Sequence, residues 1–381
     1  MLLPTLATFS SSTSAFSPPD RASVAQPKLA VRFDDGCHYE LLVGGRSWLK
    51  SGGLRLYANS EWHSAPTAET SAAAPFQVNG TIQQVAGPTN TAGTDRFGEY
   101  ERVSFEWLAT SSSGATAKFG TGARSYKDGA TVVFEQSIAD GANRTAYKEV
   151  DFSDGGNGQK AKVEPQPFLH FPSFDMPSSE LFAEAGRAGF VTWMGTMVNM
   201  HGPKAGPPTA DDLGLSSGPV VLFDGFENGG NNDAVVVSPA THFKGATMNV
   251  WADEWVVGLS GEITEVPRGF AHETIVHASK GVTATVAGFG ALMQAAHGTR
   301  KKPDVIVERI GYWTDNGAYY YGDAYPQHHD VPGNVSADYN LSCCTEAKLL
   351  AAKRALDADA IPMSYMQLDD CAPRQSRLKH A

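Results

Sequence analysis

The chain has 381 residues and a formal net charge of −11 at pH 7, with 41% hydrophobic and 19% charged residues. This length is sufficient for two domains, each with its own core. The acidic balance argues against a nucleic-acid partner, because a surface that binds phosphates needs an excess of Lys and Arg. The sequence contains no apolar run of the roughly 18 residues that a transmembrane helix needs, so no membrane partner is predicted.

Residues 1–26 are rich in Ser and Thr and are predicted to form a disordered or targeting tail. A secretory signal needs a basic start and a longer apolar centre than residues 1–7 provide, and this stretch also contains Pro4. An organellar transit peptide would need more Arg than the single Arg21.

The four cysteines are too few and too scattered for a disulfide framework. They are Cys37, Cys343, Cys344 and Cys371. An adjacent pair such as Cys343–Cys344 does not have the spacing of metal ligands, and no cofactor is predicted. Four Asn-x-Ser/Thr sequons would be glycosylated only in a secreted protein, so the compartment is left open.

Residues 27–299 are rich in β-forming patterns. Residues 102–107 (RVSFEW) alternate between apolar and polar side chains, which is typical of a strand with one wet face, and residues 132–138 repeat this alternation. The apolar runs 220–223 and 234–237 flank a Gly/Asn-rich loop, which indicates either a long hairpin or a crossing between sheets. Residues 282–286 alternate again and are predicted as a strand.

Glycine and proline, 39 and 22 in number, punctuate these strands at short intervals. Many short strands with such punctuation predict a large antiparallel β-sandwich. The glycine pairs at 120–122 (GTG) and 288–290 (GFG) are interpreted as turns, because neither lies in the strand–loop–helix context of a phosphate site. Residues 295–304 are polar and basic and are predicted to be a linker.

The segment 304–370 has the pattern of a strand–helix–strand unit. An apolar β-run at 305–307 leads into a loop crowded with aromatics and carboxylates, and a helix is predicted at 345–358. A second strand, at 361–368, ends at Asp369 and Asp370. In α/β barrels the carboxyl ends of the strands carry the active site.

Four residues at these strand ends are candidates for binding a sugar: Trp313, Asp315, Asp369 and Asp370. An indole face can stack on a pyranose ring, and carboxylates accept hydrogen bonds from sugar hydroxyls. The alternatives are a Trp that fills the core and an Asp pair that serves a turn or a helix N-terminus. The sequence QHHD at 327–330 is interpreted as a solvated loop, and no metal site is predicted.

Three segments carry a resemblance to a known family. GYWTDNGAYYY at 311–321 and YMQLDD at 365–370 resemble the opening of the catalytic barrel in the α-galactosidase and raffinose-synthase-like glycoside hydrolases. Residues 258–276 are similar to the segment that joins sandwich to barrel in the raffinose-synthase-like branch. The resemblance implies a β-sandwich before a TIM barrel, with Asp369 and Asp370 gripping a galactose near its 4- and 6-hydroxyls.

The expected fold is therefore mainly β, with a large antiparallel β-sandwich followed by a truncated (β/α) TIM-barrel fragment. The predicted domains are a tail (1–26), the sandwich (27–299) and the first two barrel strands (300–381). The resemblance places the nucleophile and the acid/base of the family on later strands, so no catalytic residue is predicted. Adjacent aspartates on one strand end also point apart, whereas retaining hydrolysis needs two carboxyl groups about 5 Å apart.

The expected function is that of a glycoside-hydrolase-like protein acting on α-galactosides or raffinose-type oligosaccharides, in a truncated and catalytically incomplete form. The expected partner is an oligosaccharide or α-galactoside. The alternative is a non-catalytic β-sandwich module that binds carbohydrate or serves as a scaffold. The sequence leaves these two possibilities open.

Overall fold

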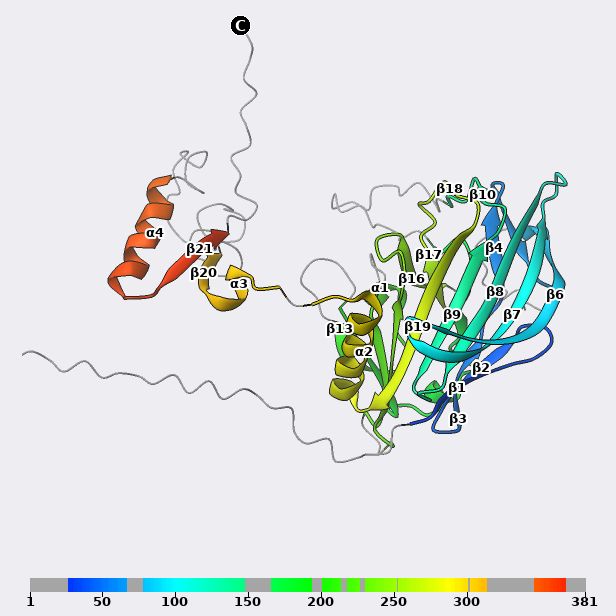
Figure 1. Ribbon diagram of the computed structural model, residues 1–381, viewed down its shortest axis with the longest axis horizontal. Coiled ribbons are helices and arrows are strands. Elements are labelled where there is room, and N and C mark those ends of the chain that lie inside the picture. Colours follow the sequence, from blue (N-terminus) through cyan, green and yellow to red (C-terminus); the bar gives the residue numbers. More distant parts are fainter. Residues whose placement is uncertain are drawn as a thin grey trace, which may run out of the picture. The chain divides into compact units, whose positions relative to one another are not determined.

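The structure is a computed structural model that describes residues 27–66, 78–147, 166–193, 201–213, 218–226, 230–251, 253–300, 302–313 and 346–367 (Figure 1). The chain divides into two compact units. Residues 1–299 form unit 1 and residues 300–381 form unit 2.

Unit 1 is built on two large sheets. Within the described residues, the larger sheet has eleven strands in the order β13 (His201–Ala205), β12 (Ala188–Thr192), β14 (Val220–Asp224), β15 (Asp233–Pro239), β19 (Phe270–Lys280), β9 (Thr131–Ile138), β8 (Thr116–Tyr126), β7 (Gly98–Thr110), β6 (Val78–Asp95), β5 (Glu61–Ser64) and β4 (Arg55–Ala58). Neighbouring strands are antiparallel except for β5 and β6.

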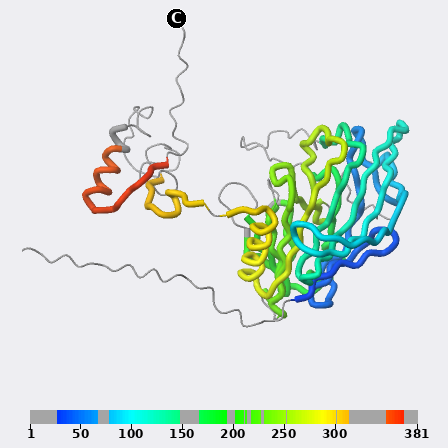
Figure 2. The backbone as a smooth tube through the Cα atoms, viewed as in Figure 1, coloured from blue at the N-terminus to red at the C-terminus, as the bar shows by residue number. Residues whose placement is uncertain are grey.

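The smaller sheet has six described strands, in the order β1 (Leu29–Phe33), β2 (Tyr39–Val43), β3 (Arg46–Ser51), β11 (Ser173–Asp175), β17 (Glu254–Leu259) and β16 (Ala246–Trp251). A short pair, β10 (Ala142–Asn143) and β18 (Glu265–Val266), and the short helices η1 (Glu180–Phe182) and α1 (Ala210–Leu213) complete the connections. Figure 2 traces the early strands, in blue, within the same body as the yellow strand β19.

The two sheets share one hydrophobic core. Tyr39 on β2 of the smaller sheet packs against Phe134 on β9 of the larger one, with ring centroids 5.1 Å apart. Trp255 and Trp107, also from opposite sheets, belong to the same buried cluster. Side chains of this kind each contribute roughly 1.5–3 kcal/mol when fully buried. The arrangement agrees with the predicted mainly β fold in which large sheets pack face to face.

The period-two segments lie in strands, as predicted. Residues 102–107 fall within β7, where Phe105 and Trp107 are buried and Glu106 is exposed. Residues 132–138 fall within β9. The strands β14 and β15 pair antiparallel, with Val220 opposite Val237. The apolar runs on either side of the Gly/Asn-rich loop therefore form a hairpin.

The predicted strand at 282–286 is wrong, because these residues begin helix α2 (Val282–His297). Phe289, Leu292 and Ala296 recur at helical spacing and pack against a buried cluster on the outer face of the larger sheet. This packing outweighs the β-propensity of the Val- and Thr-rich start. The helix also includes the first three residues of the predicted linker, and it ends at Gly298 in the left-handed conformation (φ 61°).

The two glycine pairs are not turns. Residues 120–122 lie within β8, and residues 288–290 lie within α2. A Cβ at Gly122 would lie 2.4 Å from the carbonyl oxygen of Val103, and one at Gly288 would lie 2.7 Å from Nε2 of His277. These glycines therefore permit close packing inside regular elements.

Unit 2 contains α3 (Val305–Glu308), β20 (Ile310–Trp313), α4 (Glu346–Ala358) and β21 (Met363–Gln367). The predicted strand at 305–307 is wrong: the Asp304 carboxylate accepts a hydrogen bond from the backbone N–H of Ile306 (3.1 Å) and caps a single helical turn. The predicted helix is confirmed as α4. The strands β20 and β21 pair parallel, so the unit is a strand–helix–strand motif.

Among the helices in the described ranges, none has both the length and the apolar character needed to cross a membrane.

Candidate functional site

Only one of the four predicted sugar-binding residues lies within the described part of the chain. Trp313 is the last residue of β20, and its side chain is 48% exposed, so its indole face is available to a ligand. Asp315, Asp369 and Asp370 lie outside the described residues.

The pairing of β20 with β21 places Trp313 at the carboxyl edge of this two-stranded sheet. Trp313 lies opposite Gln367, the last residue of β21. Because the strands are parallel, their carboxyl ends meet at the same edge of the sheet. In the sequence, Asp315 follows Trp313 by two positions, and Asp369 follows Gln367 by two positions.

A second aromatic ring lies on the same face of this pair. A Cβ at Gly311 would lie 2.2 Å from the ring of Tyr365, so this ring covers the backbone of β20 at the glycine. Positions 311 and 313 face the same way on a strand, because side chains alternate with a period of two. Tyr365 therefore lies on the same face of the strand pair as Trp313.

Unit 1 contains a separate cavity of about 260 Å³, which we call the sandwich cavity. It is lined by residues of the β1–β2 turn, the segment after β3, the start of β11 and the first residue of β17. The lining residues used below are Tyr39, Gly52, Gly53, Leu54, His170, Phe171, Ser173, Asp175 and Glu254. The cavity is lined mainly by small and polar groups, with Leu54 and Phe171 as apolar members.

A bidentate ion pair stands at one wall of the sandwich cavity. Arg55 donates from Nη1 to Oε2 of Glu254 (2.6 Å) and from Nη2 to Oε1 (3.0 Å). The backbone N–H of Gly53 also donates to Oε2 of Glu254 (3.2 Å). The pair is nearly excluded from water, since the side chains of Arg55 and Glu254 are 4% and 15% exposed.

His170 is the second polar group of the cavity, and it is fully buried. Its ring meets the indoles of Trp62 and Trp251 edge-on, with centroids 5.0 Å and 4.8 Å away. Burial, followed by the nearby charge of Arg55, lowers the pKa of His170 well below its usual value, so the ring is neutral. The carbonyl of Pro167 works against this shift, but neither ring nitrogen forms a hydrogen bond of normal geometry.

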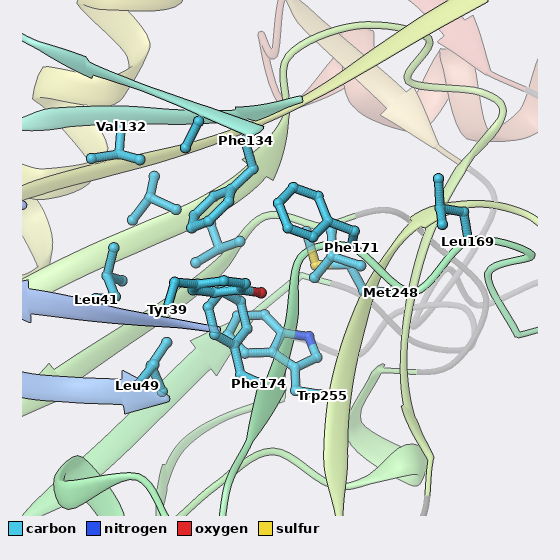
Figure 3. Packing of buried hydrophobic residues seen from close by; sticks show 14 of the residues in the cluster. Tyr39, Leu41, Leu49, Val132, Phe134, Leu169, Phe171, Phe174, Met248 and Trp255 are labelled. Carbon is cyan, nitrogen blue, oxygen red and sulfur yellow. The ribbon is translucent and has the colours of Figure 1, made fainter. Parts of the chain in front are cut away.

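Tyr39 and Ser173 fix the inner end of the cavity. The Tyr39 hydroxyl donates to the carbonyl of Ser173 (2.7 Å) and accepts from its backbone N–H (2.8 Å). Figure 3 shows the rings of Tyr39, Phe171, Phe174 and Trp255 gathered in the buried cluster. Burial raises the pKa of Tyr39 well above its usual value, so the hydroxyl stays protonated and keeps its donor role.

Cys37 also lines the cavity, but its chemistry is not that of a nucleophile. Burial raises the pKa of its thiol to about 12, so the reactive thiolate does not form near neutral pH. In the described ranges, no three His, Cys, Asp or Glu side chains gather as metal ligands would. The cavity presents hydrogen-bonding groups and some apolar surface.

Sequence reasoning missed the sandwich cavity. Arg55 and Glu254 are 199 positions apart, and no local pattern links them. The available signals were weak: a charge at an inward position of the strand-like run 54–58, and a His within the apolar run 168–171.

No protein-family profile matches the chain, and no curated protein matches it. Among solved structures, an α-N-acetylgalactosaminidase of Bifidobacterium bifidum has a TM-score of 0.45 at 12% identity, with 90% of this chain and 50% of that chain covered. A glycoside hydrolase family 97 enzyme of Pseudoalteromonas sp. strain K8, in complex with panose, has a TM-score of 0.36 at 11% identity, with 75% and 38% covered. The chain spans half the length of these enzymes or less, and similarity at this level establishes neither a family nor a function.

Proposed function

We propose that the chain is a glycoside-hydrolase-type carbohydrate-binding protein that holds α-galactosides or raffinose-type oligosaccharides at the carboxyl edge of β20 and β21. In this proposal, unit 2 is the first strand–helix–strand segment of a (β/α)8 barrel, and the sandwich of unit 1 precedes it. Trp313, Asp315, Asp369 and Asp370 form the sugar-binding wall.

The observation that carries the proposal is the parallel register of β20 and β21. In this register Trp313 lies opposite Gln367, so the carboxyl ends of both strands lie at the same edge of the sheet. Ligands of open and closed α/β sheets bind at that edge.

The side chains at this edge have the chemistry that a sugar needs. The exposed indole of Trp313 offers a flat apolar surface for the C–H face of a pyranose, and Tyr365 lies on the same face of the strand pair. Carboxylates that follow the strands accept hydrogen bonds from hydroxyls, and such charge-assisted bonds are the stronger kind. A single wall of this type buries one side of a ligand, so the expected affinity is weak, in the millimolar range of roughly 4 kcal/mol.

The test is calorimetric titration of raffinose into the purified chain 1–381 and into the double variant Asp369→Ala, Asp370→Ala. Each lost hydrogen bond to a charged group costs about 1.5–3 kcal/mol, so the double variant should bind at least tenfold more weakly. The matched control is Asp357→Ala, Asp359→Ala, which removes two carboxylates near the carboxyl end of α4 and should leave the affinity unchanged. Equal raffinose affinities for all three proteins would overturn the proposal.

A further inference from the structure

Part of strand β6 has a neighbouring strand on one side only. β6 pairs with β7 from Thr81 to Asp95, but it pairs with β5 only at Val78, Gly80 and Thr81. Residues 89–95, which we call the β6 edge, therefore have β7 on one side and no described strand on the other. In an antiparallel ladder, alternate residues direct their N–H and C=O groups away from the partner strand, so the β6 edge presents a row of such groups.

The β6 edge is regular and almost uncharged. The register shifts of β6 against β7, and Pro88, all come before it, and from Thr89 to Asp95 the pairing with β7 runs without interruption. Residues 89–92 are exposed, and they are Thr, Asn, Thr and Ala. The one charged residue is Asp95 at the far end, which forms an ion pair with Arg124 of its own chain.

The four strands that end the two large sheets are each protected, in contrast to the β6 edge. β4 is four residues long, and its Leu56 forms an isolated bridge with Leu169. β13 contains Pro203 and Lys204, and β1 contains Arg32. β16 contacts helix α1. Short length, proline, charge and a covering element are the features by which natural proteins prevent edge pairing, and residues 89–94 have none of them.

We propose that the β6 edge is a self-association site, at which two copies of this chain pair their β6 strands antiparallel about a twofold axis. The same segment then contacts itself, as in other twofold dimers, and the larger sheets of the two copies become one continuous sheet. The inference does not rest on the proposed function of unit 2, because the residues that carry it lie in unit 1.

The charges and side chains of this region favour a second copy as the partner. Residues 89–94 are uncharged, so self-pairing sets no like charges opposite each other. The nearest carboxylates on β7, Glu99 and Glu101, would face those of the other copy across three strand spacings, about 14 Å, which exceeds the Debye length of about 8 Å. A strand from a different protein is selected through pockets for its side chains, and the Thr, Asn, Ala and Gly of the β6 edge are too small to form them.

The length of the β6 edge limits the strength of the dimer. Its seven paired positions span about 24 Å. One strand pair of this length buries less than the roughly 1,200–2,000 Å² of a stable interface. The dimer should therefore be reversible and form as the protein concentration rises.

The test measures association by sedimentation velocity over a range of concentrations, together with amide hydrogen exchange of the peptide that contains residues 89–95. The background is chain 1–381 with Ile306→Asp and Val307→Asp, because these two side chains of unit 2 are 60% and 58% exposed and offer a second cause of association. Far-UV circular dichroism confirms that each protein is folded.

The disrupting variant is Ala92→Lys. Ala92 is exposed and lies opposite Glu101 on β7, so the new lysine has an ion-pair partner within its own chain. In the dimer, lysines from the two copies approach each other near the twofold axis. The matched control is Thr81→Lys, which adds the same charge at an exposed position of β6 that has Ser64 of β5 on one side and Thr110 of β7 on the other.

We expect a dimer whose fraction rises with concentration, and exchange at residues 89–95 that slows in parallel, because pairing protects the amides of the β6 edge. Ala92→Lys should weaken the dimer roughly fivefold or more, and Thr81→Lys should leave it unchanged. If Ala92→Lys does not fold, the concentration dependence of the exchange decides by itself.

Three results would overturn the proposal. The first is a monomer at every concentration, and the second is a dimer that Ala92→Lys and Thr81→Lys weaken equally or not at all. The third is a dimer in which exchange at residues 89–95 does not depend on concentration, since the contact then lies on another surface. None of these results bears on raffinose binding, so either proposal can fail while the other stands.

Discussion

Arg55 and Glu254 form a two-pronged ion pair across 199 positions of sequence, with N–O distances of 2.6 Å and 3.0 Å. The pair joins β4 of the larger sheet to β17 of the smaller one. Both side chains are almost fully removed from water, so each charge depends on the other.

Removal of one partner of this pair should be costly. We expect Glu254→Ala to lower the free energy of unfolding by roughly 3–5 kcal/mol, because it leaves the Arg55 guanidinium buried without its carboxylate. The measurement is urea denaturation of the parent chain and the variant, followed by circular dichroism. The matched control is Glu99→Ala, since Glu99 pairs with Lys127 at the surface with both side chains at least 60% exposed. A Glu254→Ala variant as stable as the control would show that the pair does not hold the sheets together.

Stability should fall as the pH drops below the usual pKa of histidine, in part because of His272. This residue is buried on β19, with Nδ1 3.3 Å from the Thr241 hydroxyl. Burial, followed by the charge of His242, lowers the pKa of His272 from 6.5 to about 3. Between these two values the unfolded chain takes up a proton that the folded chain does not, so folding loses up to about 1.4 kcal/mol per pH unit as the pH falls.

The corresponding measurement compares the parent chain with His272→Gln by denaturation at several pH values from 7 to 5. The variant should lose less stability over this range, because it lacks the group that titrates only in the unfolded state. Parallel stability curves for the two proteins would contradict this assignment of the pH dependence.

Much of the fold follows from local patterns in the sequence. The alternation that places Phe105 and Trp107 on one face predicts β7, and the apolar runs on either side of the Gly/Asn-rich loop predict β14 and β15. In unit 2, α4 and β21 follow from local signatures, whereas the first strand, β20, begins only after the apolar run at 305–307 that the sequence predicted as a strand.

Other features depend on tertiary contacts that no local pattern reports. Helix α2 begins with a Val- and Thr-rich segment that favours a strand. The helical spacing of its apolar residues is visible only when Phe289, Leu292 and Ala296 are taken together. The turn α3 depends on the Asp304 cap, which a search for apolar runs overlooks. The sandwich cavity brings Arg55, His170 and Glu254 together from three distant segments, and only the packing of the sheets reveals it.

Unit 2 should promote self-association of the chain. Its exposed large apolar side chains are Val305, Ile306, Val307, Ile310, Trp313, Leu350 and Ile361, with exposed fractions from 38% to 60%. Exposed large apolar side chains in such number favour contact between copies. We expect sedimentation velocity to show a concentration-dependent shift to larger species, and the variant Ile306→Asp, Val307→Asp to reduce that shift.

The control for this experiment is Val85→Asp in unit 1, where the replaced side chain is 51% exposed and thus comparable with Ile306 and Val307. An equal reduction by the control would mean that added charge, and not the surface of unit 2, governs the association. A monomer at all concentrations would contradict the prediction.

The most direct test of the central claim, that the carboxyl edge of β20 and β21 binds a sugar, is the raffinose affinity of Trp313→Ala measured beside that of Trp193→Ala. The two indoles are equally exposed, at 48% and 49%, but Trp193 lies in unit 1. If Trp313 stacks on the sugar, its replacement should weaken binding about tenfold, while the Trp193 variant keeps the parent affinity. Unchanged raffinose binding by Trp313→Ala, or an equal loss in both variants, would contradict the account.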